Sequence, residues 1–341
     1  MRRILCALCA FALALSLAGC GKQQEEPAQI SLFAMDTYMT IYAYGENGAE
    51  AVAAAGRAIN DLESAISRTM EGSDIQRLND CGMARVSDTT RDVLALALEF
   101  AENTGGAFDI TVAPLVSLWN ITGENPHVAT QEEIDTLLPF VGSEHVHLDG
   151  NDVSLDAGCA VDLGGIGKGY AAAQVYDVLK SYGVEHAFLS LGGNVLVMGG
   201  KPDGKQWTVA IQDPAKLDDY AAYLALGESF VVTSGGYQRF FTADDGTVYQ
   251  HILDPHTGAP AHSDLTSVTI VTTNGTLADA YSTALYVMGE AGAVDFWRAR
   301  GGDDGFEMVL ITEDGRLLYT PGLSACISAP KGCRYTYQAI A

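Results

Sequence analysis

Ten residues crowded with glycine, Val161 to Tyr170, constrain this chain more than any other segment. The pattern predicts a strand, a turn with four glycines at 164, 165, 167 and 169, and then a helix. Glycine lets the backbone approach a ligand closely, and a helix N-terminus offers free N–H groups to phosphate. The segment matches neither common nucleotide fingerprint, because Gly169 follows Lys168 where a P-loop needs Ser or Thr, and Tyr170 stands where a Rossmann motif needs glycine. A turn that only packs a helix against a sheet is the alternative.

The remaining pattern predicts an α+β fold with mixed or antiparallel sheets flanked by helices. Apolar residues recur at helical spacing in some segments and alternate in others, and the strands come in runs rather than between successive helices. Helices are expected over Ala49–Ile66, Val93–Asn103, a segment opened by Thr130 and Glu133, Thr276–Met288 and Gly292–Arg300. Strands are expected over Ser31–Tyr44, Ala187–Val197, Trp207–Ile211, Tyr223–Leu226, Ser229–Thr233, Tyr249–Leu253 and Leu265–Thr272, with hairpins over His145–Leu155 and Phe306–Thr320.

Three oxygen-bearing side chains, Asp279, Ser282 and Thr283, fall on one face of the helix predicted from Thr276. Oxygen ligands are those that Mg²⁺ prefers, and this ion keeps several waters or substrate phosphates alongside few protein ligands. The segment therefore offers a magnesium site. The alternative is structural: Thr276 as N-cap, with Asp279 at the third helical position, would simply cap the helix.

Two further segments contain candidate functional residues. His251 lies in a predicted strand that runs into an Asp-Pro turn, and a histidine that titrates near neutrality can take a proton from a hydroxyl nucleophile. The segment Gly106–Val112, with Trp119 nearby, could wall an aromatic pocket. For both segments the structural alternative, a strand histidine and a piece of core, stays open.

The N-terminus is expected to be a targeting segment. Arg2 and Arg3 precede an apolar run that is too short to span a bilayer and fits a secretory signal peptide over residues 1–19. The run ends in Leu-Ala-Gly-Cys, which resembles the lipobox of bacterial lipoproteins. Cys20 is therefore predicted to be lipidated, residues 20–30 to form a tether, 31–330 a single domain with two subdomains as an option, and 331–341 a tail. An extracytoplasmic, membrane-anchored protein is expected.

The formal net charge of −24 argues against a nucleic-acid partner, since such a surface repels phosphates. An anionic ligand must instead be attracted locally by a cation or by backbone N–H groups. Among the cysteines, Cys326 and Cys333 are the closest candidates for a disulfide in an oxidising compartment. His145 and His147 share a strand face and suggest a metal pair, but the sequence offers no third ligand nearby.

Taken together, the segments resemble the FAD:protein FMN transferases, the ApbE family. Seven motifs occur in the family's order between about Met35 and Leu323. They are Ala34–Thr37, Gly106–Trp119, Asp162–Tyr170, Leu191–Asn194, Thr233–Gly236, His251–Gly258 and Ala278–Leu285. The resemblance implies Mg²⁺-dependent transfer of FMN from FAD to a Thr or Ser hydroxyl of an acceptor protein, with release of AMP. Exported or membrane domains such as those of Rnf- or Nqr-type complexes are the expected acceptors.

The resemblance also implies site residues. FAD would be lined by Met35, Ala107, Phe108, Asp109, Asp162, Lys168 and Leu253. Mg²⁺ would be held by the Gly165 carbonyl together with Asp279, Ser282 and Thr283, and His251 is the candidate base.

The chain departs from the family pattern at three places. Asp36 stands where members often have glycine, no aromatic residue occurs in Ser67–Thr69 to stack on flavin, and Ser282 stands where some members have Asp.

Three other functions remain open. Water could replace the acceptor, which would make the protein an FAD hydrolase, or the protein could bind flavin without turnover. The segment Asp279–Ala284 also faintly resembles the acceptor motif of flavinylated domains, although Leu285 occupies the terminal hydroxyl position. A solute-binding lipoprotein would explain the anchor but none of the internal motifs.

Overall fold

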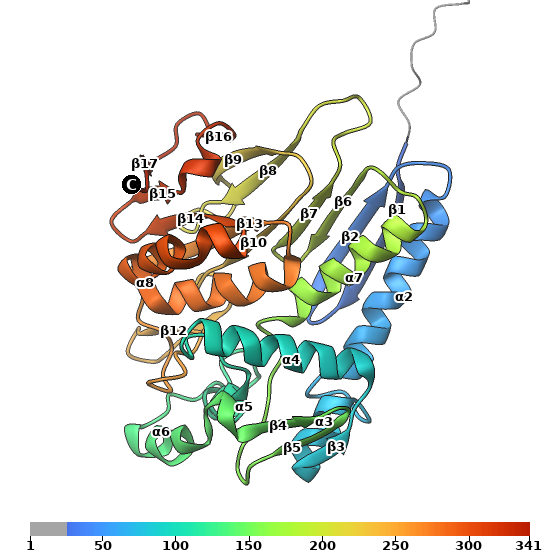
Figure 1. Ribbon diagram of the computed structural model, residues 1–341. Helices are drawn as coiled ribbons and strands as arrows, with labels where there is room; N and C mark the ends of the chain where they lie inside the picture. The colour runs from blue at the N-terminus through green and yellow to red at the C-terminus, as the bar shows by residue number, and fades with distance from the viewer. Residues whose placement is uncertain (1–25) are drawn as a thin grey trace, which may run out of the picture.

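The computed structural model describes residues 26–341 and is built around one sheet of nine strands. Figure 1 shows helices packed in front of this sheet. The strand order is β1-β2-β6-β7-β10-β13-β14-β15-β17, and every neighbouring pair is antiparallel except β15 and β17. The strands are β1 (Ala28–Ala34), β2 (Thr37–Ala43), β6 (Ala187–Leu191), β7 (Asn194–Met198), β10 (Ser229–Ser234), β13 (Leu265–Thr272), β14 (Phe306–Thr312), β15 (Arg316–Tyr319) and β17 (Thr336–Ala339). The α+β expectation with mixed and antiparallel sheets is therefore confirmed.

Helices cover one face of this sheet and a second, smaller sheet covers part of the other. The covering helices are α2 (Gly48–Ile66), α7 (Gly167–Ser181) and α8 (Gly275–Asp304), and their apolar sides form the largest core with the sheet. On the opposite face lie β8 (Trp207–Gln212), β9 (Tyr220–Leu226) and β16 (Ile327–Ser328), which form a separate core. Within residues 26–341, no helix is both long and apolar enough to cross a membrane.

The lower part of the molecule in Figure 1 is made of short elements around α4 (Asp88–Asn103). A three-stranded sheet combines β3 (Met83–Arg85), β4 (Val146–Asp149) and β5 (Asp152–Leu155), beside α3 (Asp74–Cys81). A third core gathers α5 (Ala113–Trp119), α6 (Gln131–Leu137) and the hairpin of β11 (Phe240–Thr242) with β12 (Val248–Gln250). Short 3₁₀ turns cover Ile110–Val112, Leu138–Phe140, Ser143–His145 and Pro321–Leu323.

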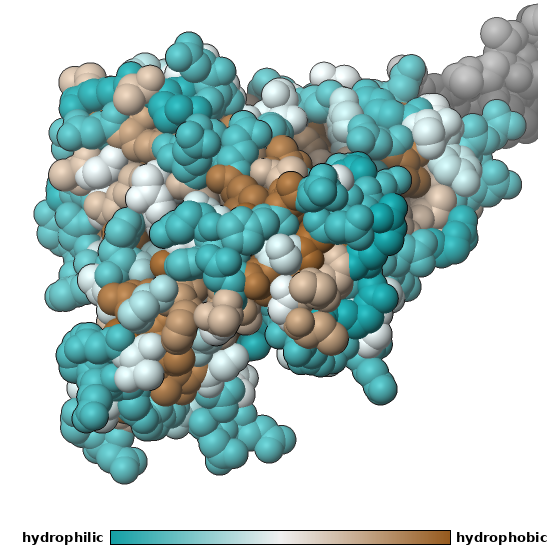
Figure 2. All heavy atoms as spheres, turned by 60° about the horizontal axis from the view of Figure 1, so that its bottom comes forward, coloured by the Kyte–Doolittle hydropathy of each residue, from teal (hydrophilic) through white to brown (hydrophobic). Residues whose placement is uncertain are grey.

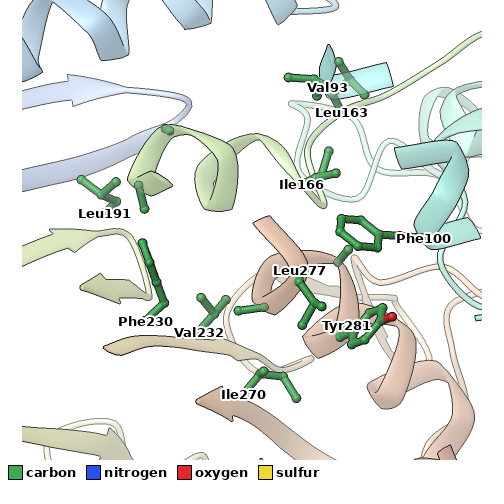
Figure 3. Close-up of a cluster of buried hydrophobic side chains, with 14 of the residues drawn as sticks. Val93, Phe100, Leu163, Ile166, Leu191, Phe230, Val232, Ile270, Leu277 and Tyr281 are labelled. Atoms are coloured by element: carbon green, nitrogen blue, oxygen red, sulfur yellow. The ribbon is translucent and has the colours of Figure 1, made fainter. Parts of the chain in front are cut away.

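Side-chain packing joins the glycine turn to both neighbouring helices. Ile166 of the turn, Phe100 of α4 and Tyr281 of α8 are all buried and lie in one cluster (Figure 3). The rings of Phe100 and Tyr281 meet edge to face, with centroids 5.6 Å apart. Apolar burial of this kind stabilises a fold by about 25 cal/mol per Å², so the cluster fixes where the turn sits against α8.

Several predicted elements agree closely with the structure. The helix expected over Ala49–Ile66 is α2, and the hairpin expected over Phe306–Thr320 is β14–β15. The side chain of Ser87 caps α4. At α6 the Thr130 side chain and Glu133 form both bonds of a capping box.

Other predicted elements were wrong in ways that have local causes. Ser31–Tyr44 is a hairpin rather than one strand, because Met35 and Asp36 turn the chain with φ of 50° and 55°. Ala187–Val197 likewise divides into β6 and β7. Val161 lies outside any strand, because the Asn79 side-chain amide bonds both its N–H and its C=O, at 2.8 and 2.9 Å. By contrast, the two predicted C-terminal helices are confirmed as two helical segments of α8, which meet at the non-helical residue Gly289 (φ 72°).

The ends of the predicted domain also differ from the structure. The predicted signal peptide and Cys20 lie outside the described residues. Strand β1 already begins at Ala28, within the predicted tether, and the predicted tail contributes β17 to the large sheet. Cys326 and Cys333 are free thiols, so the expected disulfide is absent from this structure. On the face shown in Figure 2, hydrophilic residues dominate the periphery and hydrophobic ones gather in patches across the middle.

Candidate active site

The glycine turn and the first turns of α8 meet directly. The backbone N–H of Gly169 donates a hydrogen bond of 2.7 Å to Oδ2 of Asp279, which is almost fully buried. A Cβ on Gly169 would overlap the carbonyl oxygen of Gly275 and lie 2.5 Å from Cβ of Asp279. The absence of a side chain at Gly169 is therefore required for the close packing of α7 against α8. A turn that served only for packing would not explain why a carboxylate is buried at this contact.

Asp279 does not cap its helix, contrary to the structural alternative. The N-cap of α8 is Asn274, whose side chain accepts from Leu277 N–H at 3.1 Å. Thr276 is already inside the helix. The Asp279 carboxylate instead leaves α8 and bonds across to α7, so it is placed by tertiary contact and not by helix capping.

The other two predicted metal ligands, Ser282 and Thr283, lie near Asp279 on α8, but their hydroxyls face different neighbours. A Cβ atom added to Gly165 would lie 3.9 Å from Oγ1 of Thr283, so the Thr283 hydroxyl faces the glycine turn. Ser282 is fully buried, and its Oγ lies 2.8 Å from Oγ of Ser234. Ser234 also lies 3.4 Å from Oγ1 of Thr283. The sequence contained Ser234 in its Thr-Ser-Gly-Gly motif, but only the structure places it among these hydroxyls.

Asp162 and Lys168 lie on the glycine turn itself. Asp162 forms an ion pair with Arg68, with Nε 2.8 Å from Oδ2, and accepts the Gly164 N–H at 2.7 Å. Arg68 thus lies beside the turn, in the segment where the family's flavin-stacking aromatic is missing. The Lys168 ammonium makes only a long contact of 3.5 Å with the Gly164 carbonyl oxygen, which leaves it available to an anion.

His251 is partly buried at the end of the β11–β12 hairpin. Burial, followed by the positive charges of Arg239 and Lys168, lowers the pKa of His251 to about 4. Its Nδ1 lies 3.1 Å from the carbonyl oxygen of Arg239, which can only accept, so Nδ1 carries the proton and Nε2 keeps its lone pair. That tautomer is the one a general base needs.

The β1–β2 turn is linked to the His251 segment. Arg239 Nη2 donates to the Asp36 carbonyl oxygen at 3.0 Å, and Met35 N–H donates to Oε1 of Glu63 at 2.6 Å. Both Met35 and Asp36 have left-handed backbone, which costs a non-glycine residue roughly 1–2 kcal/mol. Glycine would adopt this conformation without that cost. The bonds of Arg239 to Asp36 and to His251 bring the β1–β2 turn close to the His251 segment.

The segment Ala107–Asp109 is buried against the glycine turn. The ring of Phe108 lies 3.1 Å from the Cβ position of Gly165, and Asp162 N–H donates to the Ile110 carbonyl oxygen at 2.7 Å. Oδ1 of Asp109 accepts from the N–H and the hydroxyl of Thr111, at 2.7 and 2.6 Å. Burial nevertheless raises the pKa of Asp109. Asp109 also lines a cavity of about 320 Å³ together with Gly106, Gly142, Glu144 and His256.

Leu253 is the least clearly placed of the predicted FAD residues. Its side chain is buried in the third core with Leu115 and Trp119, and its backbone pairs with Pro260. No direct contact of Leu253 with the glycine turn is evident in the described part of the chain. A second cavity, of about 380 Å³, surrounds the α8 kink at Gly289 and is lined by none of the predicted residues.

The donor set suits a hard cation better than a transition metal. In residues 26–341 no three His, Cys, Asp or Glu side chains are grouped to hold a metal ion. The predicted metal ligands offer the Asp279 carboxylate, the hydroxyl oxygens of Ser282 and Thr283 and the Gly165 carbonyl oxygen. They lie beside the glycine turn, whose backbone N–H groups suit a phosphate. Mg²⁺ binds through one or two carboxylates plus substrate phosphate oxygens, so these residues fit it.

The chain is similar to one protein family over most of its length and to several individual proteins of that family. A family model described as the ApbE family matches residues 35–308, so the chain belongs to the ApbE family. A Vibrio cholerae protein named FAD:protein FMN transferase is 33% identical over 294 residues, covering 83% of this chain and 87% of that one. A Treponema pallidum protein of the same name is 35% identical, covering 68% and 69%.

Solved structures show the same relationship. The ApbE protein of Thermotoga maritima superposes with a TM-score of 0.81 at 34% identity, covering 88% of this chain and 99% of its own. The flavin transferase ApbE of Vibrio cholerae gives 0.77 at 28% identity, covering 88% and 99%.

Proposed function

We propose that this enzyme, a flavin transferase of the ApbE family, moves FMN from FAD to a Thr or Ser hydroxyl of an acceptor protein and releases AMP, with Mg²⁺ as cofactor. The names of its relatives support FMN transfer. The observation that carries the proposal is the contact between Gly169 N–H and the Asp279 carboxylate, which brings an oxygen-rich helix face to a phosphate-type turn.

The residues divide the work of phosphoryl transfer among them. Asp279, Thr283 and the Gly165 carbonyl would hold Mg²⁺, which when bound neutralises charge on the diphosphate oxygens. Lys168 and the turn amides would bind the bridging or AMP-side phosphate. The acceptor hydroxyl attacks the FMN phosphorus, the bond from that phosphorus to the AMP phosphate oxygen breaks, and Nε2 of His251 takes the hydroxyl proton.

The depressed pKa of His251 is compatible with that role. An anionic diphosphate near an imidazole raises its pKa, and pairing of Lys168 with phosphate removes one of the charges that lower it. We therefore infer that His251 becomes a stronger base only once FAD is bound. The low pKa keeps the imidazole neutral at physiological pH, and the rise in pKa on FAD binding makes it a stronger proton acceptor.

The acceptor and the membrane are also part of the proposal. Lipidation of Cys20 would place the enzyme on the outer side of the cell membrane, and exported or membrane domains such as those of Rnf- or Nqr-type complexes would be its acceptors. The motif ending in Cys20 and the polar residues that follow it support this arrangement.

The substitution Asp279→Asn tests the proposal. Asparagine can still accept the Gly169 N–H but carries no charge, so the fold should survive. Transfer should fall by at least about 10-fold, because the loss of even an outer-shell partner of a metal costs roughly 10- to 100-fold. The assay follows in-gel flavin fluorescence of an acceptor domain incubated with enzyme, FAD and Mg²⁺. Undiminished transfer would refute the metal assignment.

Analysis of the soluble products of the same incubation separates the other functions. FMN and AMP formed at equal rates with and without acceptor would show a hydrolase. FAD binding with no turnover would show a storage protein. Covalent FMN on this chain, detected by mass spectrometry, would show an acceptor.

A further inference from the structure

Ser234 is held rigidly between the large sheet and α8. It is the last residue of β10 and pairs with Val268 of β13. Two glycines follow it, and a Cβ on Gly236 would lie 2.6 Å from Oη of Tyr286 in α8. The backbone at Ser234 therefore cannot move away from the helix without losing sheet pairing, and its hydroxyl is fixed in front of Ser282 and Thr283.

The hydroxyls of Ser234, Ser282 and Thr283 form a chain of hydrogen bonds that runs in one direction. Each hydroxyl has a single proton and two acceptor lone pairs. Ser282 Oγ donates to the Asp279 carbonyl oxygen at 2.9 Å, so the proton in its 2.8 Å bond with Ser234 comes from Ser234. Ser234 Oγ then has only lone pairs to offer Thr283, at 3.4 Å. The order is Thr283 to Ser234 to Ser282 to the helix carbonyl, and bonds in such a chain strengthen one another.

We propose that Ser234 is a positioning residue that accepts the Thr283 hydroxyl proton and so turns the Thr283 lone pairs toward the cation beside the glycine turn. The proposal rests on the magnesium site of the proposed function. A hydroxyl ligates a cation only through a lone pair, and its proton must find an acceptor on the far side. The Asp279 carbonyl oxygen is the other acceptor near Thr283, also at 3.4 Å, and it already receives the Ser282 proton.

The serine at position 282 explains why Thr283 would need an orienting partner. A carboxylate at this position would be a charged ligand with no proton to orient. In this chain Ser282 is fully buried and its hydroxyl is committed to Ser234 and the helix carbonyl. Ser282 therefore contributes indirectly, through Ser234, and Thr283 becomes the side-chain hydroxyl that faces Gly165.

The test measures Mn²⁺ binding to the full-length chain in detergent, by electron paramagnetic resonance, without FAD or acceptor. Ser234→Ala should weaken Mn²⁺ affinity about 3- to 10-fold, the value of one ordinary hydrogen bond. Ser234→Thr keeps the hydroxyl and should restore wild-type affinity. Ser234→Cys keeps the volume but bonds weakly, and should behave like alanine.

A matched control lies one residue away. Thr233 bonds Thr269 of β13 at 2.9 Å, on the opposite face of β10 because side chains alternate along a strand. Thr233→Val should therefore leave Mn²⁺ affinity unchanged. FAD binding in EDTA should be the same in all variants, whereas general loosening of the site would alter it.

The outcomes separate the two proposals. Wild-type Mn²⁺ affinity in Ser234→Ala, or an equal loss in Thr233→Val, would overturn the role of Ser234 and leave flavin transfer untouched. Absence of Mg²⁺-dependent transfer by the wild-type enzyme would overturn the proposed function, whatever the Mn²⁺ titrations show.

Discussion

Replacing Gly169 with alanine is the most direct probe of how the site is built. Gly169 is where α7 touches α8, and a methyl group there would overlap the Gly275 carbonyl oxygen and lie 2.5 Å from Cβ of Asp279. Ordinary van der Waals contact begins at 3.4 Å, so the two helices would have to separate by about 1 Å. Both obstacles are main chain or directly attached to it, so no side-chain rotation relieves the clash.

Two effects of Gly169→Ala lower the free energy of unfolding and one raises it. Overpacking of a well-packed contact costs roughly 1–3 kcal/mol. Lengthening the hydrogen bond from Gly169 N–H to the buried Asp279 carboxylate costs roughly 1.5–3 kcal/mol. Alanine in a helix returns about 1 kcal/mol relative to glycine. Gly169→Ala should therefore lower the free energy of unfolding by about 1.5–5 kcal/mol and weaken Mn²⁺ binding at the same time.

Gly167→Ala is the control within the same helix. A Cβ there would meet only Cδ1 of Ile66, at 3.1 Å, the far end of a flexible side chain. Urea unfolding followed by circular dichroism should show less than about 1 kcal/mol of change for this variant. If both variants unfold alike and Gly169→Ala binds Mn²⁺ normally, the close approach of α7 and α8 does not set the site.

Two further predictions concern His251 and Cys20. Because burial holds the pKa of His251 near 4 while the unfolded chain binds its proton near 6.5, stability should be full above about pH 6.5 and fall as pH drops toward 4. His251→Gln should flatten that acid loss by up to about 3 kcal/mol in urea titrations. An identical pH profile would contradict the lowered pKa of the imidazole. Cys20→Ser should move the enzyme from membrane to soluble fractions, and a variant that still sediments with membranes would exclude the lipid anchor.

The sequence by itself determined the local elements and the order of the motifs. Helical spacing over Ala49–Ile66 and the capping residues Thr130 and Glu133 predicted real helices, because these signals act within a few residues. The oxygen-bearing residues at 279, 282 and 283 were found for the same reason. Glycines at 164–169 predicted a tight approach, and α7 begins among them at Gly167.

What the sequence missed depends on contacts between distant residues. Val161 reads as a strand, but the side chain of Asn79, 82 residues earlier, takes its hydrogen bonds. Residues 336–339 read as a tail, yet they pair with β15 in the large sheet.

Only the tertiary structure decided what Asp279 and Ser234 do. From sequence, Asp279 could equally be a helix cap, and the direction of its carboxylate was settled by the Gly169 N–H, 110 residues away in the chain. Ser234 lies beside Ser282 because β10 ends against α8. Periodicity reports which face of an element is buried, but not which other element covers it. That choice is made by packing of the whole core, where side chains from many segments compete for the same space.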